Sequence, residues 1–269
     1  MSQKSKEDRQ LAKQFERLVK VTEILRGPTG CPWDRAQTHQ TIKIKTIEEA
    51  YEVAQVIEEK NDSRLVDELG DLLLQVLFHS HIAAERGAFS LSDVLEHLRR
   101  KLIRRHPHVF GSDKVQTAEQ ALSRWEKSKA EEKRDQGSVM DGIAWAMPSL
   151  LLAYQVQKKA SAVGFDWGDS LAALDKVKEE LSETEQALAT PLEKEQVEGE
   201  IGDLLFAVVN VARLAGVNPE AALRQAVRKF VTRFQEMERT ITESGRSLSQ
   251  VSLKEMDQVW DQLKGAHNE

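Results

Sequence analysis

The stretch DELGDLLLQVLF at residues 67–78 recurs later in the chain as GEIGDLLFAVVN at residues 199–210. Two more matches accompany it in the same order: IEEAYEV at 47–53 with KEELSET at 178–184, and RKLIRRH at 100–106 with RKFVTRF at 228–234. All three pairs are separated by nearly the same length of chain. An ordered series of matches at one spacing indicates an internal duplication.

Apolar residues recur at the helical period along nearly the whole chain, whereas the alternation typical of strands is hard to find. The sequence therefore predicts an all-α fold of two tandem helical modules, each resembling a four-helix bundle. The polar segment AEEKRDQGSVMDG at 130–142 is typical of a linker. We accordingly predict an N-terminal domain at 1–130, a linker at 131–144 and a C-terminal domain at 145–269.

The composition limits the class of protein. Charged residues make up 30% of the chain and aromatic residues 6%, which is typical of a soluble, helix-rich protein. The formal net charge of -6 argues against broad binding of nucleic acid. The single cysteine, Cys31, cannot form an internal disulfide, which suits a reducing compartment. Because no apolar signal segment or membrane-spanning run is found, we expect a cytoplasmic protein with no membrane partner.

Each copy carries two acidic pairs in which the second carboxylate follows the first by three residues. The pairs are Glu49 with Glu52 and Glu68 with Asp71 in the first copy, and Glu180 with Glu183 and Glu200 with Asp203 in the second. Residues three apart lie on one face of a helix, so both members of a pair can point toward one object.

The two pairs of each copy lie at equal distances from a predicted helix break. KNDS at 60–63 is typical of a turn, with Asn61 or Asp62 as the cap of the next helix. Pro191 breaks the second copy. In an antiparallel hairpin, residues equidistant from the turn share one height. Each copy is therefore predicted to bring four carboxylates together, about 14 Å from its turn.

These carboxylates are typical of a metal site. The second pair of each copy stands in a strongly apolar helix, which is normally buried, and acids are seldom buried unless paired or bound to metal. Oxygen ligands favour Mg²⁺, with Mn²⁺ as a substitute, over zinc. A solvated helix face explains one acidic pair, but not two related pairs that occur twice. A di-iron bundle is excluded, because none of the seven histidines follows a glutamate by three positions.

The tandem pattern EExxE followed by ExxD resembles the MazG family of the all-α nucleoside triphosphate pyrophosphatase superfamily. The segments GCPWD at 30–34, RRHPHVF at 104–110, VGFDW at 163–167 and GDLLFAVVN at 202–210 are also similar to that family. The resemblance covers almost the whole chain. It implies a homodimer that hydrolyses ribo- and deoxyribonucleoside triphosphates to the monophosphate and pyrophosphate, with Mg²⁺ and broad base specificity.

The resemblance also implies roles for residues of the C-terminal copy, which is the catalytic copy expected in this family. Glu180, Glu183, Glu200 and Asp203 would hold Mg²⁺ while water attacks the α-phosphorus. Glu179 or Glu180 is the nearest candidate for the general base. The N-terminal copy would then support assembly or regulation, although its own carboxylates, Glu49, Glu52, Glu68 and Asp71, form a complete second set.

An acidic protein needs basic side chains at its site to bind an anionic substrate. Lys229 and Arg233 stand four residues apart on a predicted helix, as Lys101 and Arg105 do in the first copy, and the resemblance identifies the later pair as phosphate-binding. Lys176, one turn before Glu180, is a further candidate. Trp260 is a candidate either for stacking on the base or ribose or for a packing anchor.

The sequence is also compatible with two other functions. One is a narrower hydrolase of the same superfamily, because base selectivity depends on pocket shape. The other is a nucleotide- or metal-sensing helical scaffold with little turnover, although a scaffold has no need of two buried acidic sets. The helix predicted at 65–81 is apolar on more than one face, so a four-helix bundle within each module or across a dimer is needed to cover it.

Overall fold

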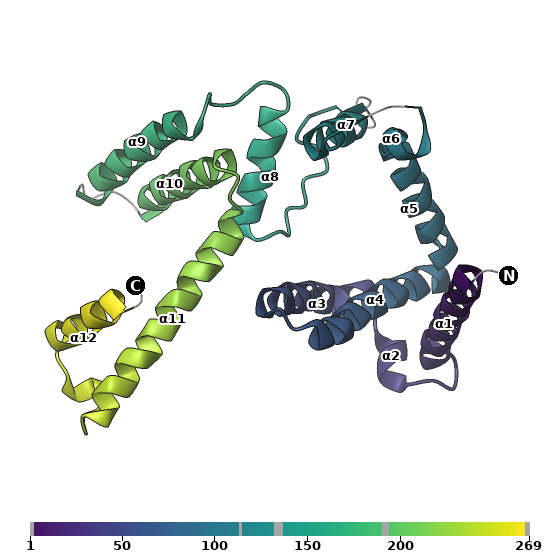
Figure 1. Ribbon diagram of the computed structural model, residues 1–269, viewed down its shortest axis with the longest axis horizontal. Helices are drawn as coiled ribbons and strands as arrows, with labels where there is room; N and C mark the ends of the chain where they lie inside the picture. Colours follow the sequence, from purple (N-terminus) through teal and green to yellow (C-terminus); the bar gives the residue numbers. More distant parts are fainter. Residues whose placement is uncertain (1–2, 113–114, 132–136, 190–193, 267–269) are drawn as a thin grey trace. The chain divides into compact units, whose positions relative to one another are not determined.

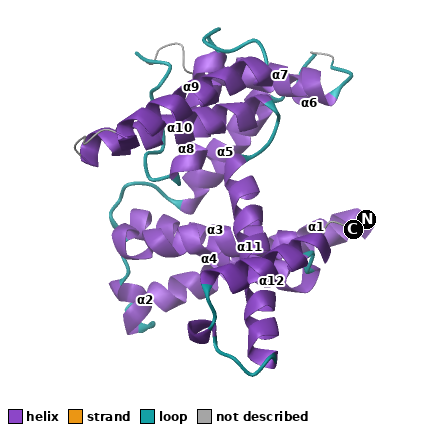
Figure 2. Ribbon diagram, turned by 90° about the vertical axis from the view of Figure 1, so that its left-hand side faces the viewer, coloured by secondary structure: helices purple, strands orange, loops and turns teal. Residues whose placement is uncertain are grey.

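The computed structural model describes residues 3–112, 115–131, 137–189 and 194–266, and every regular element in these ranges is helical (Figure 2). The all-α prediction is confirmed. The first seven helices are α1 (Gln3–Arg26), α2 (Pro32–Ala36), α3 (His39–Glu59), α4 (Asp62–Glu85), α5 (Leu91–Arg105), α6 (Pro107–Phe110) and α7 (Ala118–Glu131). They are followed by α8 (Ser149–Ser161), α9 (Ser170–Ala189), α10 (Lys194–Leu214), α11 (Pro219–Glu243), the 3₁₀ helix η1 (Leu248–Gln250) and α12 (Leu253–Ala266). No helix of the described ranges combines the length and hydropathy that a membrane span requires.

The chain divides into two compact units, Met1–Lys133 and Arg134–Glu269. The duplicated segments fall on α3, α4 and α5 in the first unit and on α9, α10 and α11 in the second. Residues 132–136 of the predicted linker lie outside the described residues, so the boundaries at 130 and 145 stay predictions.

The first unit centres on an antiparallel hairpin of α3 and α4 (Figure 1). Lys60 ends α3 in the left-handed conformation, with φ of 53°. The side chain of Asn61 then caps α4 by accepting a hydrogen bond from the backbone N–H of Arg64 at 3.2 Å. This cap satisfies one of the backbone donors that a helix start leaves unpaired. The predicted turn at 60–63 is confirmed, with Asn61 as the cap.

The other helices of the first unit hold this hairpin at its open end. α1 packs against α4 and α2. The guanidinium of Arg26 donates to both carboxylate oxygens of Glu85 at 2.8 and 2.7 Å, and the hydroxyl of Thr22 lies 2.8 Å from His81 Nε2. At the same end of the hairpin, Ile42 packs with Phe78 and other apolar residues of α4. α5 packs against α4, and α6 and α7 pack against α5.

The second unit repeats the hairpin with α9 and α10 (Figure 1). The two helices are separated by residues 190–193, so the predicted break at Pro191 lies outside the described residues. α8 packs against α10, where the amide of Gln157 donates to the carbonyl oxygen of Phe206 at 2.8 Å. α11 packs against α8, and α12 folds back onto α11.

Both units leave apolar helix faces exposed. In the second unit, side chains at helical spacing stay exposed on α10 and α11, and they include Ile201, Leu205, Val208, Leu223, Val227 and Phe230. In the first unit, the same is true of α4 and α5, at Val66, Leu69, Val76, Leu95, Leu98 and Leu102. Contiguous apolar faces of this kind are typical of surfaces that another chain covers.

Candidate metal centre

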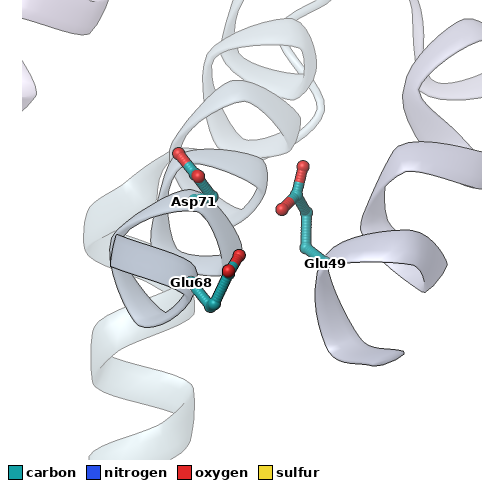
Figure 3. Close-up of side chains that lie close together, drawn as sticks. All are labelled: Glu49, Glu68 and Asp71. Carbon is teal, nitrogen blue, oxygen red and sulfur yellow. The ribbon is translucent and has the colours of Figure 1, made fainter. Parts of the chain in front are cut away.

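Three carboxylates of the first unit converge between α3 and α4. Glu49 projects from α3 toward Glu68 and Asp71 of α4 (Figure 3), and one carboxylate oxygen of each lies within 4.8 Å of the others. Glu68 and Asp71 stand three residues apart and share one face of α4. The break at Lys60 sets Glu49 at their height, because both arms of the hairpin start from the same turn. We call these three residues the N-terminal triad.

The second unit builds the same arrangement from different helices. Glu180 of α9 meets Glu200 and Asp203 of α10, again with one carboxylate oxygen of each within 4.8 Å of the others. We call these residues the C-terminal triad. The hydroxyl of Thr184, one turn after Glu180, donates to the Glu180 carbonyl oxygen at 2.8 Å and reaches the Glu200 carbonyl oxygen at 3.4 Å. This contact ties the two arms of the hairpin beside the triad.

The structure does not bring the fourth predicted ligand of either copy into its triad. Glu52 and Glu183 are exposed side chains, one turn nearer the break than the buried glutamates. Both still lie close to their triads, since Glu52 acts on Glu49 through its charge and a side-chain hydrogen bond, and the Glu180 carboxylate repels that of Glu183. Each fourth glutamate therefore stands at the margin of its triad.

Burial and mutual repulsion act on Glu49 in the N-terminal triad and on Glu183 at the margin of the C-terminal triad. Glu49 is 9% exposed and Glu180 is 6% exposed. Burial, together with the carboxylates of Glu52 and Asp71, raises the pKa of Glu49 above its usual value. Desolvation, followed by the Glu180 carboxylate, raises the pKa of Glu183. Converging acids that resist ionisation are stabilised by a divalent cation. Because every donor is a carboxylate oxygen, the residues fit a hard cation such as Mg²⁺.

A lysine lies one turn before the buried glutamate in each unit. Lys176 donates from its ammonium to Glu179 at 2.8 Å and pairs with Glu180 at 2.6 Å. These hydrogen bonds raise the pKa of Lys176, so the ammonium stays charged. The equivalent Lys45 pairs with Glu48 at 2.7 Å. Sequence reasoning missed Lys45 and Glu48, although their positions in the repeat match those of Lys176 and Glu179.

The predicted cationic and aromatic residues of the C-terminal copy gather on α11 and α12. The guanidinium of Arg233 lies over the Trp260 ring, 5.3 Å from its centroid, and the ring of Phe230 lies 5.2 Å from that of Trp260. Trp260 therefore packs against α11, as the anchor interpretation expects, while keeping a cation on its face. The Nε atom of Arg233 is buried and has no hydrogen-bond partner among the described residues. Lys229 is exposed one turn earlier.

The first unit contains a matching pair that the sequence did not reveal. Arg105 of α5 lies over the ring of Trp125 on α7, 5.6 Å from its centroid, and Lys129 lies over the same ring at 5.2 Å. Arg105 and Arg233 are equivalent in the repeat. A signal was available, because a tryptophan follows each basic pair, 20 residues after Arg105 and 27 residues after Arg233.

The triad and the cationic cluster of the second unit remain separate groups. Glu180 stands on the α9–α10 hairpin, whereas Arg233 and Trp260 are held by the packing of α12 on α11. Within the described ranges, no hydrogen bond or ion pair joins Lys229, Arg233 or Trp260 to the C-terminal triad. The structure of one chain therefore does not bring the predicted phosphate-binding residues to the predicted metal ligands.

Comparison with known proteins identifies the duplicated module. The family model for the MazG nucleotide pyrophosphohydrolase domain matches residues 37–110 and 169–237, which contain the two triads. A nucleoside triphosphate pyrophosphohydrolase/pyrophosphatase of Thermotoga maritima is 46% identical over 252 residues, covering 93% of this chain and 96% of that protein.

Two further relatives extend the similarity. A nucleoside triphosphate pyrophosphohydrolase of Escherichia coli K12 is 42% identical over 255 residues, covering 93% of this chain and 97% of that protein. The Bacillus subtilis protein YabN is 41% identical over 260 residues, which cover 96% of this chain but 53% of YabN. With the family model matched twice and relatives aligned over nearly the full length, the chain belongs to the MazG nucleotide pyrophosphohydrolase family.

Proposed function

We propose that this chain hydrolyses nucleoside triphosphates, of both ribose and deoxyribose type and of any base, to the monophosphate and pyrophosphate in a Mg²⁺-dependent reaction. The observation that carries the proposal is the C-terminal triad, in which three carboxylates from two helices converge in a chain of this family. The names of the Thermotoga maritima and Escherichia coli relatives support the same chemistry.

In this proposal the carboxylates of the C-terminal copy have two roles, as metal ligands and as the general base. Glu180, Glu200 and Asp203 hold the cation, with Glu183 as the marginal fourth ligand. Mg²⁺, or Mn²⁺ in its place, supplies charge neutralisation at the triphosphate when it is bound. Glu180 and Glu179 are the two candidates for the general base. Glu179 is the better placed, because it stays outside the triad and its carboxylate is free of the ligand role.

The reaction itself is a single displacement. Glu179 accepts a proton from the attacking water, whose oxygen bonds to the α-phosphorus while the bond from that phosphorus to the bridging oxygen breaks. Pyrophosphate leaves and the nucleoside monophosphate keeps the water oxygen. Lys176 exchanges its contacts with Glu179 and Glu180 for phosphate oxygens, which frees the Glu179 carboxylate as the substrate arrives.

We further propose that the working form is a homodimer. The triad and the Lys229–Arg233–Trp260 cluster are separate in one chain, and a second copy can bring one to the other. The exposed apolar faces of α10 and α11 support this, because burying them against another chain stabilises the assembly. Light scattering should give twice the chain mass of 30.4 kDa, and a particle of single-chain mass at working concentrations would contradict the dimer.

The direct test of the activity follows the products of ATP by ³¹P nuclear magnetic resonance, with Mg²⁺ and again with EDTA. We expect AMP and pyrophosphate, both lost on chelation. ADP with orthophosphate would place the cut at the wrong phosphorus and contradict the proposal. A panel of bases then separates broad from narrow specificity, because comparable rates on all bases exclude a narrow hydrolase. Tight binding of Mg²⁺–nucleotide with no product from any nucleotide would favour the sensing scaffold.

A further inference from the structure

A glutamine next to the N-terminal triad has an oxygen with no partner. Gln75 of α4 is 7% exposed, and its Oε1 atom accepts no hydrogen bond from any described residue. A buried carbonyl oxygen without a donor carries a desolvation cost that native proteins usually avoid. Such an oxygen is stabilised by a ligand, and a cation is one that a carbonyl oxygen binds well.

The position of Gln75 on α4 directs it toward the triad. Glu68, Asp71 and Gln75 follow one another at three and then four residues, so they share one face of the helix. Glu49 shows where that face points, because it approaches Glu68 and Asp71 from α3 (Figure 3). The Cα of Gln75 lies about 6 Å along the helix from that of Asp71, at a rise of about 1.5 Å per residue. The long glutamine side chain can cover that distance, directly or through one water.

The polar groups on the other side of Gln75 already have hydrogen-bond partners. One turn later, His79 lies 3.1 Å through its Nε2 from the Thr46 hydroxyl and 2.8 Å through its Nδ1 from His39 Nδ1. These groups pair with one another and not with Gln75. Asp71 of the triad stands one turn before Gln75 on the same helix face, so a cation held there is a suitable partner for the Oε1 atom.

The C-terminal module lacks this oxygen. In the aligned segments, Ala207 takes the place of Gln75, one turn after Asp203, and it is also buried at 7% exposure. A methyl group cannot bind a cation, so the two modules differ in the donor set available beside otherwise matching triads.

We propose that Gln75 supplies a fourth protein oxygen to the cation held by the N-terminal triad, either directly or through one coordinated water. A neutral amide oxygen raises the number of donors without adding to the repulsion among the carboxylates of Glu49, Glu68 and Asp71. The N-terminal module thereby binds its cation without help from the phosphates of a nucleotide. This inference rests on the cation-binding part of the proposed function and not on hydrolysis.

The test measures Mn²⁺ binding to the full chain, without nucleotide, by electron paramagnetic resonance of the free ion. The Asp203→Asn substitution is made first, so that the C-terminal triad no longer contributes to the measured Mn²⁺ binding. In that background, Gln75→Leu keeps the side-chain volume and removes the oxygen, and it should weaken Mn²⁺ binding about tenfold or more. Gln75→Glu should tighten binding. Gln157→Leu, which changes the buried glutamine of the other unit, should leave the N-terminal affinity unchanged.

The outcomes separate the two claims. Unchanged Mn²⁺ affinity in Gln75→Leu, with binding lost in Glu68→Gln, would overturn the role of Gln75 while leaving the triad as a cation site. A chain with an intact N-terminal triad that binds no Mn²⁺ would overturn the inference together with the N-terminal cation site. Thermal unfolding of each variant without metal is the control for misfolding. The unfolding temperature of a folded Gln75→Leu protein should be no lower than that of its parent, because the substitution removes a buried oxygen that has no hydrogen-bond partner.

Discussion

In the N-terminal triad the buried Glu49 faces other carboxylates, whereas in the C-terminal triad the buried Glu180 is paired with Lys176 at 2.6 Å. Among the described residues, the cations near the N-terminal triad pair with carboxylates other than that of the buried Glu49. Lys45 binds Glu48, and Arg64 reaches Glu68 at 3.3 Å while holding Glu59 at 2.7 Å.

A comparison of the residues around the two triads shows which part of the module is the same in both copies. The three carboxylates and their convergence are the same in both copies, but the groups around them have diverged. Gln75 stands where the other copy has Ala207, and the stacked rings of His39 and His79, with centroids 5.1 Å apart, are specific to the first unit. The geometry of the three carboxylates is thus common to both modules, and the modules differ in the residues around it.

The largest effect should come from removing one carboxylate in each triad in turn. We expect Glu200→Ala to abolish turnover, with a loss of at least about 100-fold, because even the partners that orient metal ligands cost about 10- to 100-fold. The matched Glu68→Ala should leave most of the turnover. Steady-state hydrolysis of ATP measures both, and equal losses would contradict the assignment of catalysis to the C-terminal copy.

A smaller effect should follow from the two tryptophans that lie under arginines. If Trp260 stacks on the nucleotide, Trp260→Ala should raise KM about tenfold, since stacking on an aromatic ring contributes about 1–3 kcal/mol. Trp125→Ala changes the corresponding ring of the other module and should leave KM unchanged. Because Trp260 also packs on Phe230, circular dichroism of both variants is the control. An unchanged KM in a folded Trp260→Ala protein would leave that ring as a packing anchor alone.

The smallest effect concerns stability without metal. The raised pKa of Glu49 means that the folded protein disfavours the ionised carboxylate. Ionised Glu49 therefore destabilises the folded state fully at a pH above its folded-state pKa. This destabilisation is lost as the pH falls from the folded-state pKa to the pKa of the unfolded chain. Glu49→Gln should therefore raise the unfolding temperature at pH 7 in EDTA by roughly 2 °C, with the gain shrinking toward acidic pH. Glu180→Gln removes the partner of Lys176 and should give no gain. The same increase in both variants would contradict the electrostatic difference between the triads.

The helical hairpins and the meeting of their carboxylates could be predicted from the sequence, because helix geometry fixes both faces and heights. The residues at 60–63 marked the turn, and counting outward from it placed Glu49 opposite Glu68 and Asp71. The turn chemistry of Asn61 is local, so one stretch of sequence is enough to recognise it.

The rest of the site depends on packing that periodicity does not contain. Glu52 and Glu183 share a helix face with the triad glutamates, yet a turn of difference in height leaves them exposed at its margin. The contacts of Arg105 with Trp125 and of Arg233 with Trp260 require α7 to fold onto α5 and α12 onto α11. Such long-range contacts are decided by tertiary packing. The orphaned oxygen of Gln75 is visible only when every neighbouring donor has been placed.

The measurement that tests the central claim most directly is hydrolysis of ATP in H₂¹⁸O, with both products weighed by mass spectrometry. Attack of water on the α-phosphorus, supported by the C-terminal triad, predicts that a single ¹⁸O atom enters AMP and none enters pyrophosphate. Label in pyrophosphate with unlabelled AMP would place the attack on the β-phosphorus and contradict the account.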